Sequence, residues 1–341
     1  MAKAAGFVFA RARVVEMEFS FGHNEAARAA TEESLKIDPR NSQALALKGF
    51  LLAAKQDFKG AMAAFDQAIA ADGSLGNAWL GRGLIKISHG TVLFSRWGSS
   101  DAEGGRKDLQ VAATLEPTRS ILRSYLGKAF SNAGDGTHAR LELDLAKKLD
   151  PNDPTPWLYS SLLDQQNNRI NGAVSDLEKS QDLNDNRSVF RSRLLLDQDK
   201  AVRGANLAAI FRDAGMREQS VREATRAVDS DYANFSSHLF LANSYDELRD
   251  SHQIDLRYET PWLSELLVAN LLQPIGAGSL SQNVSQQEYS RLFSGNSLGI
   301  SSFTEYTDNG DFLQYLSQYG TVGKTAYSLD GVYRTQNGER P

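Results

Sequence analysis

A short phrase that ends in proline returns along the first half of the chain, and it constrains the fold more than any other feature. Lys36–Pro39, Thr114–Pro117 and Lys148–Pro151 each run through an apolar residue and an acidic residue to a proline. Proline cannot continue a helix, so each phrase marks a helix end. Pro117 and Pro151 lie 34 residues apart, and a fixed period of this size is typical of stacked helical repeats.

The residues inside each period resemble the tetratricopeptide repeat family. The family pattern places a Gly or Ala near the eighth position, a large residue at the eleventh, and small residues at the twentieth and twenty-seventh. The units that begin at Ser42 and Ser120 match it at Gly49, Leu52, Ala61 and Ala68, and at Gly127, Phe130, Ala139 and Ala146. The resemblance implies stacked pairs of antiparallel helices, because neither helix of a pair can bury its apolar face alone.

The predicted solenoid covers residues 1–258. Its units lie near 8–41, 42–75, 76–119, 120–153, 154–187, 201–234 and 235–258. The unit 76–119 contains an insertion at 88–105, because its closing proline comes late. Insertions in repeats map to loops on one face, often the binding face, so Phe94 and Trp97 are candidates for partner binding. The alternative is a tolerated surface loop.

Tetratricopeptide proteins bind ligands on the concave surface formed by the first helix of each unit. The resemblance assigns to that surface Phe50, Leu80, Leu84, Ile87, Lys128, Leu158, Leu162, Arg212 and Asn243. This face is largely apolar, and its two cations do not match the pattern of a clamp for a peptide carboxylate. An apolar segment or a neighbouring domain fits it better. The alternative that these residues pack within the superhelix stays open.

The composition changes near residue 259, where Lys and Arg become scarce and Ser, Gly, Tyr, Asn and Gln dominate. We expect a helix and linker at 259–278 and a β-hairpin region at 279–341. Alternating apolar and polar residues predict strands at 298–307, 312–322 and 325–335. The predicted fold class is therefore mainly α, a tetratricopeptide-type α-solenoid followed by a short antiparallel β region.

Strands of about ten residues with many aromatic side chains are a signature of outer-membrane β-barrels. The phrases Asn152–Tyr159 and Leu183–Arg193 resemble stretches of bacterial envelope proteins in which periplasmic tetratricopeptide repeats precede such a barrel. This resemblance implies the periplasm and outer membrane, a role in export or assembly, and a fragment that holds only the start of a barrel. The alternative is a soluble, cytoplasmic adaptor whose strands form a small β cap.

The residue content argues against several classes of function. The net charge of −5 disfavours nucleic acid as a partner, because phosphate binding needs clustered Lys and Arg. Cysteine is absent, and the five histidines are scattered without the spacing of metal ligands. The segment Gly320–Thr325 lacks a glycine that a phosphate-binding loop requires. We therefore expect a non-enzymatic, protein-binding scaffold without cofactor or metal, whose partner is a protein or peptide and which could also form oligomers.

Overall fold

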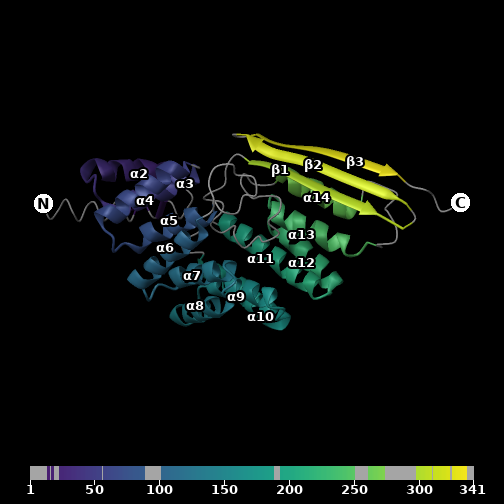
Figure 1. Cartoon of the computed structure of the whole chain (residues 1–341), viewed down its shortest axis with the longest axis horizontal. Coiled ribbons are helices and arrows are strands. Elements are labelled where there is room, and N and C mark those ends of the chain that lie inside the picture. Colours follow the sequence, from purple (N-terminus) through teal and green to yellow (C-terminus); the bar gives the residue numbers. More distant parts are fainter. Residues whose placement is uncertain are drawn as a thin grey trace. The chain divides into compact units, whose positions relative to one another are not determined.

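The computed structural model of the chain describes a series of segments that together include the helices and strands discussed below. These segments are residues 14–15, 17–18, 23–55, 57–88, 101–187, 193–249, 260–272, 297–308, 310–322 and 325–335. The chain divides into two compact units, one up to Leu196 and one that begins at Asp197 and includes the strands (Figure 1). The insertion residues Phe94 and Trp97 lie outside the described segments.

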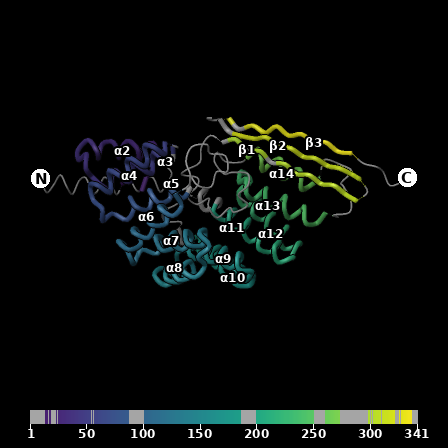
Figure 2. The backbone as a smooth tube through the Cα atoms, viewed as in Figure 1, coloured from purple at the N-terminus to yellow at the C-terminus, as the bar shows by residue number. Residues whose placement is uncertain are grey.

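The first unit is built from helices that follow one another as antiparallel pairs (Figure 2). They are α2 (Asn24–Ile37), α3 (Ser42–Ala54), α4 (Phe58–Ala71), α5 (Gly76–Ser88), α6 (Ala102–Leu115), α7 (Ser120–Asn132), α8 (Gly136–Leu149), α9 (Pro154–Gln166), α10 (Ile170–Asp182) and the short 3-10 helix η1 (Asn184–Arg187). Helix α3 packs on α4, α5 on α6, α7 on α8 and α9 on α10. In addition, α3 packs beside α5 and α7 beside α9, so first helices of successive units are neighbours.

Short polar side chains set where these helices begin. The side chains of Asp57, Asp101 and Asp135 each accept a hydrogen bond from a backbone N–H in the first turn of α4, α6 and α8. Such caps satisfy amide groups that have no partner inside the helix. Gly134, between α7 and α8, has φ of 79°, a left-handed conformation that glycine adopts without steric cost. Local sequence therefore fixes the turn that makes each hairpin.

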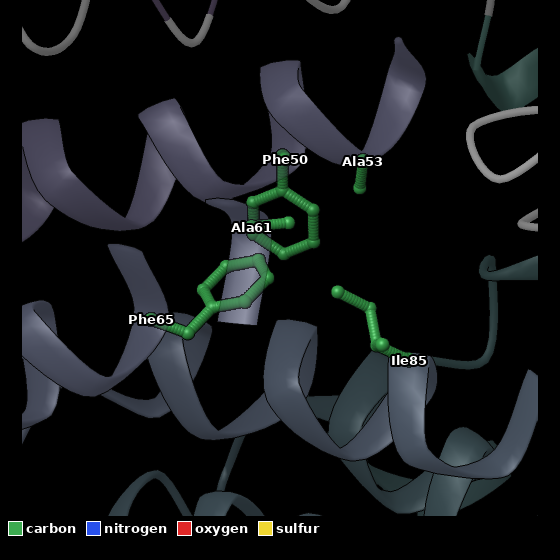
Figure 3. Close-up of a cluster of buried hydrophobic side chains, with 5 residues drawn as sticks. All are labelled: Phe50, Ala53, Ala61, Phe65 and Ile85. Carbon is green, nitrogen blue, oxygen red and sulfur yellow. The ribbon is translucent and has the colours of Figure 1, made fainter. Parts of the chain in front are cut away.

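Large apolar side chains fill the space between three successive helices. Figure 3 shows Phe50 of α3, Phe65 of α4 and Ile85 of α5 converging with Ala53 and Ala61. The rings of Phe50 and Phe65 meet edge to face, with centroids 5.0 Å apart. Burial of aromatic side chains in such contacts is a main source of stability. The core of this unit is thus a row of interhelical contacts.

The second unit joins helices to a small antiparallel sheet. Its elements are α11 (Arg193–Asp213), α12 (Arg217–Ser230), α13 (Phe235–Asp246), α14 (Pro261–Leu272), β1 (Ser297–Tyr306), β2 (Phe312–Val322) and β3 (Thr325–Thr335). Helix α12 packs on α13, and α13 packs on α14. The strand order is β1-β2-β3, and α14 lies against β2 and β3 (Figure 1). Among the described helices, none has the length and hydropathy needed to cross a membrane.

A polar cluster joins helix α14 to the sheet. Tyr315 is 1% exposed and packs with Trp262 of α14. The amide of Asn270 donates to the Tyr315 hydroxyl (3.2 Å) and to Ser317 Oγ (3.1 Å). The Tyr315 hydroxyl in turn donates to Asp330 of β3 (2.6 Å). These bonds let the Tyr315 hydroxyl and the Asn270 amide lie beneath the sheet at little cost, because both groups have partners.

Removal of the Tyr315 hydroxyl should destabilise the protein in a manner that depends on pH. Burial raises the pKa of Asp330, but hydrogen bonds from Ser317, Tyr315 and Ser328 outweigh burial, so its pKa lies below the usual value. The stabilisation that comes from this carboxylate is therefore present above the pKa of an unfolded Asp, about 3.9, and is lost as pH falls through the lower folded value. We expect Tyr315→Phe to lower the free energy of unfolding by about 1–3 kcal/mol at pH 7.

Urea unfolding at pH 7 and at a pH below the lowered folded pKa of Asp330 checks this expectation. The loss caused by Tyr315→Phe should shrink at the lower pH, where Asp330 becomes protonated and accepts more weakly. Tyr333→Phe is the matched control, since the Tyr333 side chain is largely exposed on the other face of the sheet. An equal loss at both pH values would contradict the proposed link to Asp330.

Candidate functional site

The concave-face residues predicted in the first unit come from α3, α5, α7 and α9. Four of them are buried, namely Phe50, Leu80, Leu158 and Leu162. Phe50 belongs to the cluster around Phe65 and supports the helix packing. These four side chains therefore pack inside the first unit and offer little apolar surface to a partner.

The remaining predicted residues of the first unit keep part of their surface exposed. Leu84, Ile87 and Lys128 are half-buried. Leu84 packs against the edge of the cluster that contains Phe50. Ile87 lies over Gly105, where an added Cβ would stand 2.6 Å from Ile87 Cγ1. The surface open to a partner is therefore narrower than the sequence pattern suggests.

The two other predicted residues belong to the second unit. Arg212, near the end of α11, donates to the carboxylate of Asp213 at 3.1 Å. Asn243 is half-buried on α13. Arg212 is thus paired with its own neighbour in the chain, an exposed contact of the kind that contributes little to stability.

Lys128 lies over an aromatic ring. Its Nζ atom is 5.0 Å from the centroid of the Tyr159 ring, within the range of a cation–π interaction. Tyr159 packs edge to face on Tyr125, with centroids 5.9 Å apart, and both tyrosines are buried. Sequence reasoning missed this pair. A signal was present, because Tyr125 and Tyr159 lie 34 residues apart and so occupy one position of successive repeats.

The environment of Lys128 disfavours its charge. Burial lowers the pKa of Lys128 to about 8. Removal of an ammonium group from water costs free energy unless the protein or a ligand replaces the lost solvation. Lys147, on the adjacent helix α8, makes a 2.7 Å ion pair with Asp176 and lies 4.3 Å from the Trp157 ring. Lys128 is therefore a cation on a mainly apolar face.

Replacement of Lys128 by methionine should stabilise the protein at neutral pH. The folded pKa is below the value of about 10.5 in an unfolded chain, so between pH 8 and 10.5 the unfolded state binds more protons. Stability contributed at this position therefore rises with pH across that window. We expect Lys128→Met to raise the free energy of unfolding by on the order of 1–3 kcal/mol at pH 7.

Thermal or urea unfolding across the same pH window provides the measurement. The advantage of Lys128→Met over the wild-type chain should decline as pH rises from 8 towards 10.5. Lys148→Met is the control, because Lys148 is exposed on α8 and its replacement should change little. A destabilised Lys128→Met variant would show that the ammonium contributes favourable contacts that exceed the cost of its burial.

The chemistry offered by this face is that of binding. It combines partly exposed apolar side chains with one ammonium group that rests on tyrosine. Within the described segments, no three His, Asp or Glu side chains gather in a way that could hold a metal ion. Such a surface can bury apolar groups of a ligand and attract an oxygen that carries negative charge.

Comparisons with known proteins bear on the fold. No protein-family model and no curated protein sequence matches the chain. Among solved structures, it is similar to a chain in the APC/C hetero-tetramer Cut9–Hcn1, with a TM-score of 0.59 and 14% identity over 80% of this chain and 46% of that one. The present chain thus spans less than half the length of that relative.

Two bacterial structures give lower scores. PilF of Pseudomonas aeruginosa has a TM-score of 0.49 and 17% identity, covering 71% of this chain and 99% of that one. A thermophilic TPR protein of Thermus thermophilus has a TM-score of 0.46 and 16% identity, covering 52% of this chain and 91% of that one. At these identities the likeness concerns the fold alone. The helix pairs and the similarity to Cut9–Hcn1 confirm the predicted fold class, a tetratricopeptide-type α-solenoid followed by a small antiparallel sheet.

Proposed function

We propose that the chain is a non-enzymatic scaffold that binds a segment of another protein at the face that carries Lys128. The observation behind this proposal is the placement of a lysine, with a pKa lowered to about 8 by burial, over Tyr159 on a mainly apolar face. A charge held at a cost to stability is more often found at functional sites than elsewhere. On the preceding first helix, Leu84 occupies the position that corresponds to Lys128, and Ile87 lies three residues further along. Both are half-buried and supply apolar contacts.

The expected ligand is a peptide segment with apolar side chains and one carboxylate or carbonyl oxygen for Lys128. Binding of a carboxylate would stabilise the ammonium and raise the pKa of Lys128. Affinity should therefore fall as pH rises above about 8, where the unliganded lysine loses its proton. An uncharged apolar ligand would show no such dependence.

Selection of peptides from a random library against the full chain, followed by calorimetry, tests this function. For selected peptides we expect Lys128→Met to weaken binding about tenfold or more, equivalent to about 1.4 kcal/mol. Lys148→Met is the control, since it removes an exposed lysine from the second helix of the same repeat. Peptides that bind both variants and the wild-type chain equally would place the site elsewhere and overturn the proposal.

We also propose that the protein works in the bacterial envelope, with its repeats in the periplasm and its strands at the outer membrane, in export or assembly. The supporting observation is the outer face of the sheet, the face turned away from α14. Large side chains are exposed on it, including Leu298, Ile300, Tyr306, Leu329 and Tyr333. Exposed apolar patches of this kind mark surfaces that contact a membrane or another protein.

The competing proposal is a soluble adaptor, possible also in the cytoplasm, whose sheet only caps the helices. It draws support from the other face of the sheet, where Tyr315 packs on Trp262 as in an ordinary helix–sheet core. Flotation with vesicles of bacterial phospholipid separates the two proposals. Vesicle binding that is lost in Ile300→Ser/Leu329→Ser favours the envelope. A chain that stays soluble without detergent and ignores vesicles favours the adaptor.

A further inference from the structure

Strand β3 has large exposed side chains on both faces of the sheet. It forms one edge of the sheet, since the order is β1-β2-β3. On the outer face Leu329 is 70% exposed and Tyr333 is 61% exposed. Val332 stands opposite the buried Tyr315 and so faces the side of α14, yet it is 47% exposed. Strand β3 therefore exposes both of its faces in addition to its edge.

An edge strand of this kind is a template for pairing. Within the described sheet, β3 has a neighbouring strand on one side only. Natural proteins usually protect such edges with proline, with bulges or with inward-pointing charges. Strand β3 runs for 11 residues, from Thr325 to Thr335, pairs with β2 without interruption and contains no proline. Asp330 and Arg334 of β3 point to the α14 side of the sheet, as protective charges do, but they have opposite signs and so can pair with the same two residues of a second copy.

We propose that β3 is the contact strand of a homodimer, in which two copies of the chain pair antiparallel along this edge with Val332 opposite Val332. The charges on β3 select this register. With Val332 at the twofold axis, Asp330 of each copy stands opposite Arg334 of the other, on the same face of the sheet. Opposite charges in directly opposed cross-strand positions attract, and like charges there repel.

The register with the longest ladder is less favourable electrostatically. An axis at Asp330 would give the longest ladder, but it would set the two Asp330 carboxylates against each other. A twofold axis at Val332 shortens the ladder of paired residues but forms two Asp–Arg pairs. It also brings two half-exposed valines together and places Tyr333 across from Gly331, which leaves room for the ring. The two sheets of three strands then become one continuous sheet.

Single cysteine variants test the register, because the chain contains no cysteine of its own. Directly opposed residues have Cα atoms about 4.5–5.5 Å apart, a separation that a disulfide can span. Val332→Cys should therefore form a covalent dimer under mild oxidation. Tyr327→Cys is the control, since in this register the two copies of residue 327 lie roughly 30 Å apart.

The mass of the full chain in solution and a charge reversal at Arg334 complete the test. Light scattering should give about twice the 37.4 kDa of one chain. Arg334→Asp should shift the chain towards monomer, with folding checked by circular dichroism. A monomer at all concentrations overturns the proposal. So does a dimer that Val332→Cys fails to trap or that Arg334→Asp leaves unchanged.

Discussion

Gly81→Ala should lower the free energy of unfolding by about 1–3 kcal/mol, although alanine is the better helix former. Gly81 lies on α5, and a Cβ added there would overlap the far end of the Phe65 ring. Phe65 has no exposed surface, and its ring also lies close to Gly49 of α3, where an added Cβ would stand 2.6 Å from the ring. Close packing on both sides leaves the ring little room to shift. One ring is thus held between two glycines from different helices.

A double-mutant cycle isolates this contact. Phe65→Leu removes the ring atoms that a Cβ on residue 81 would meet, so in that background Gly81→Ala should be neutral or stabilising. Gly136→Ala is the matched control, because Gly136 opens α8 and has only one neighbour, at 3.9 Å, near its added Cβ. Urea unfolding of the wild-type chain, Phe65→Leu, Gly81→Ala and the double variant gives the coupling energy. Additive effects of Phe65→Leu and Gly81→Ala would mean that the helices do not interlock here.

The periodic parts of the fold could be predicted from the sequence. The phrases that end at Pro117 and Pro151 span the ends of α6 and α8, and Gly127 stands where α7 meets Leu143 of α8. The expected strands at 312–322 and 325–335 coincide with β2 and β3. These features follow from local rules, namely helix termination, residue size at a fixed period, and side-chain alternation.

The predicted site depended on exposure, and a repeat pattern does not determine exposure. The pattern places Phe50 and Leu158 on a first-helix face, but whether neighbouring side chains cover that face depends on three-dimensional packing. In the structure both residues are buried. The contact of Lys128 with Tyr159 joins residues from different repeats, and the boundary between the two units at Leu196 carries no marker in the composition. Such features are set by long-range contacts.

The largest single effect is expected at Asp108, a carboxylate of α6 that is only 5% exposed. It accepts two hydrogen bonds from the guanidinium of Arg82, both at 2.8 Å, and an ion pair from Lys86 at 2.9 Å. Helices α5 and α6 cross closely at this point, because both Gly83 and Gly105 lack a side chain and an added Cβ on either would meet the other's carbonyl oxygen. The close approach of α5 and α6 therefore holds the Arg82–Asp108 pair in one geometry.

Asp108→Ala should cost about 3–5 kcal/mol, because it leaves the cation of Arg82 largely buried beside α6 without its main acceptor. The chain provides its own control. The same guanidinium also donates to Asp66 of α4 at 2.9 Å, but the Asp66 side chain is 57% exposed. Asp66→Ala should cost about 1 kcal/mol or less, as for exposed ion pairs.

The double variant Arg82→Met/Asp108→Ala separates the cost of burying an unpaired Arg82 from the loss of the attraction between Arg82 and Asp108. Once Arg82 and Asp108 are both neutral, the buried guanidinium no longer lacks its acceptor, and Lys86 keeps its 3.9 Å contact with Asp101. The double variant should therefore be more stable than Asp108→Ala alone. Guanidinium chloride would screen these charges, so urea is the denaturant of choice. A double variant less stable than Asp108→Ala would mean that Arg82 contributes mainly through its other contacts, with Asp66 and with the ring of Trp79, 4.5 Å away. The hydrogen bond with Asp108 is the main cause that raises the pKa of Arg82, and it favours the first outcome.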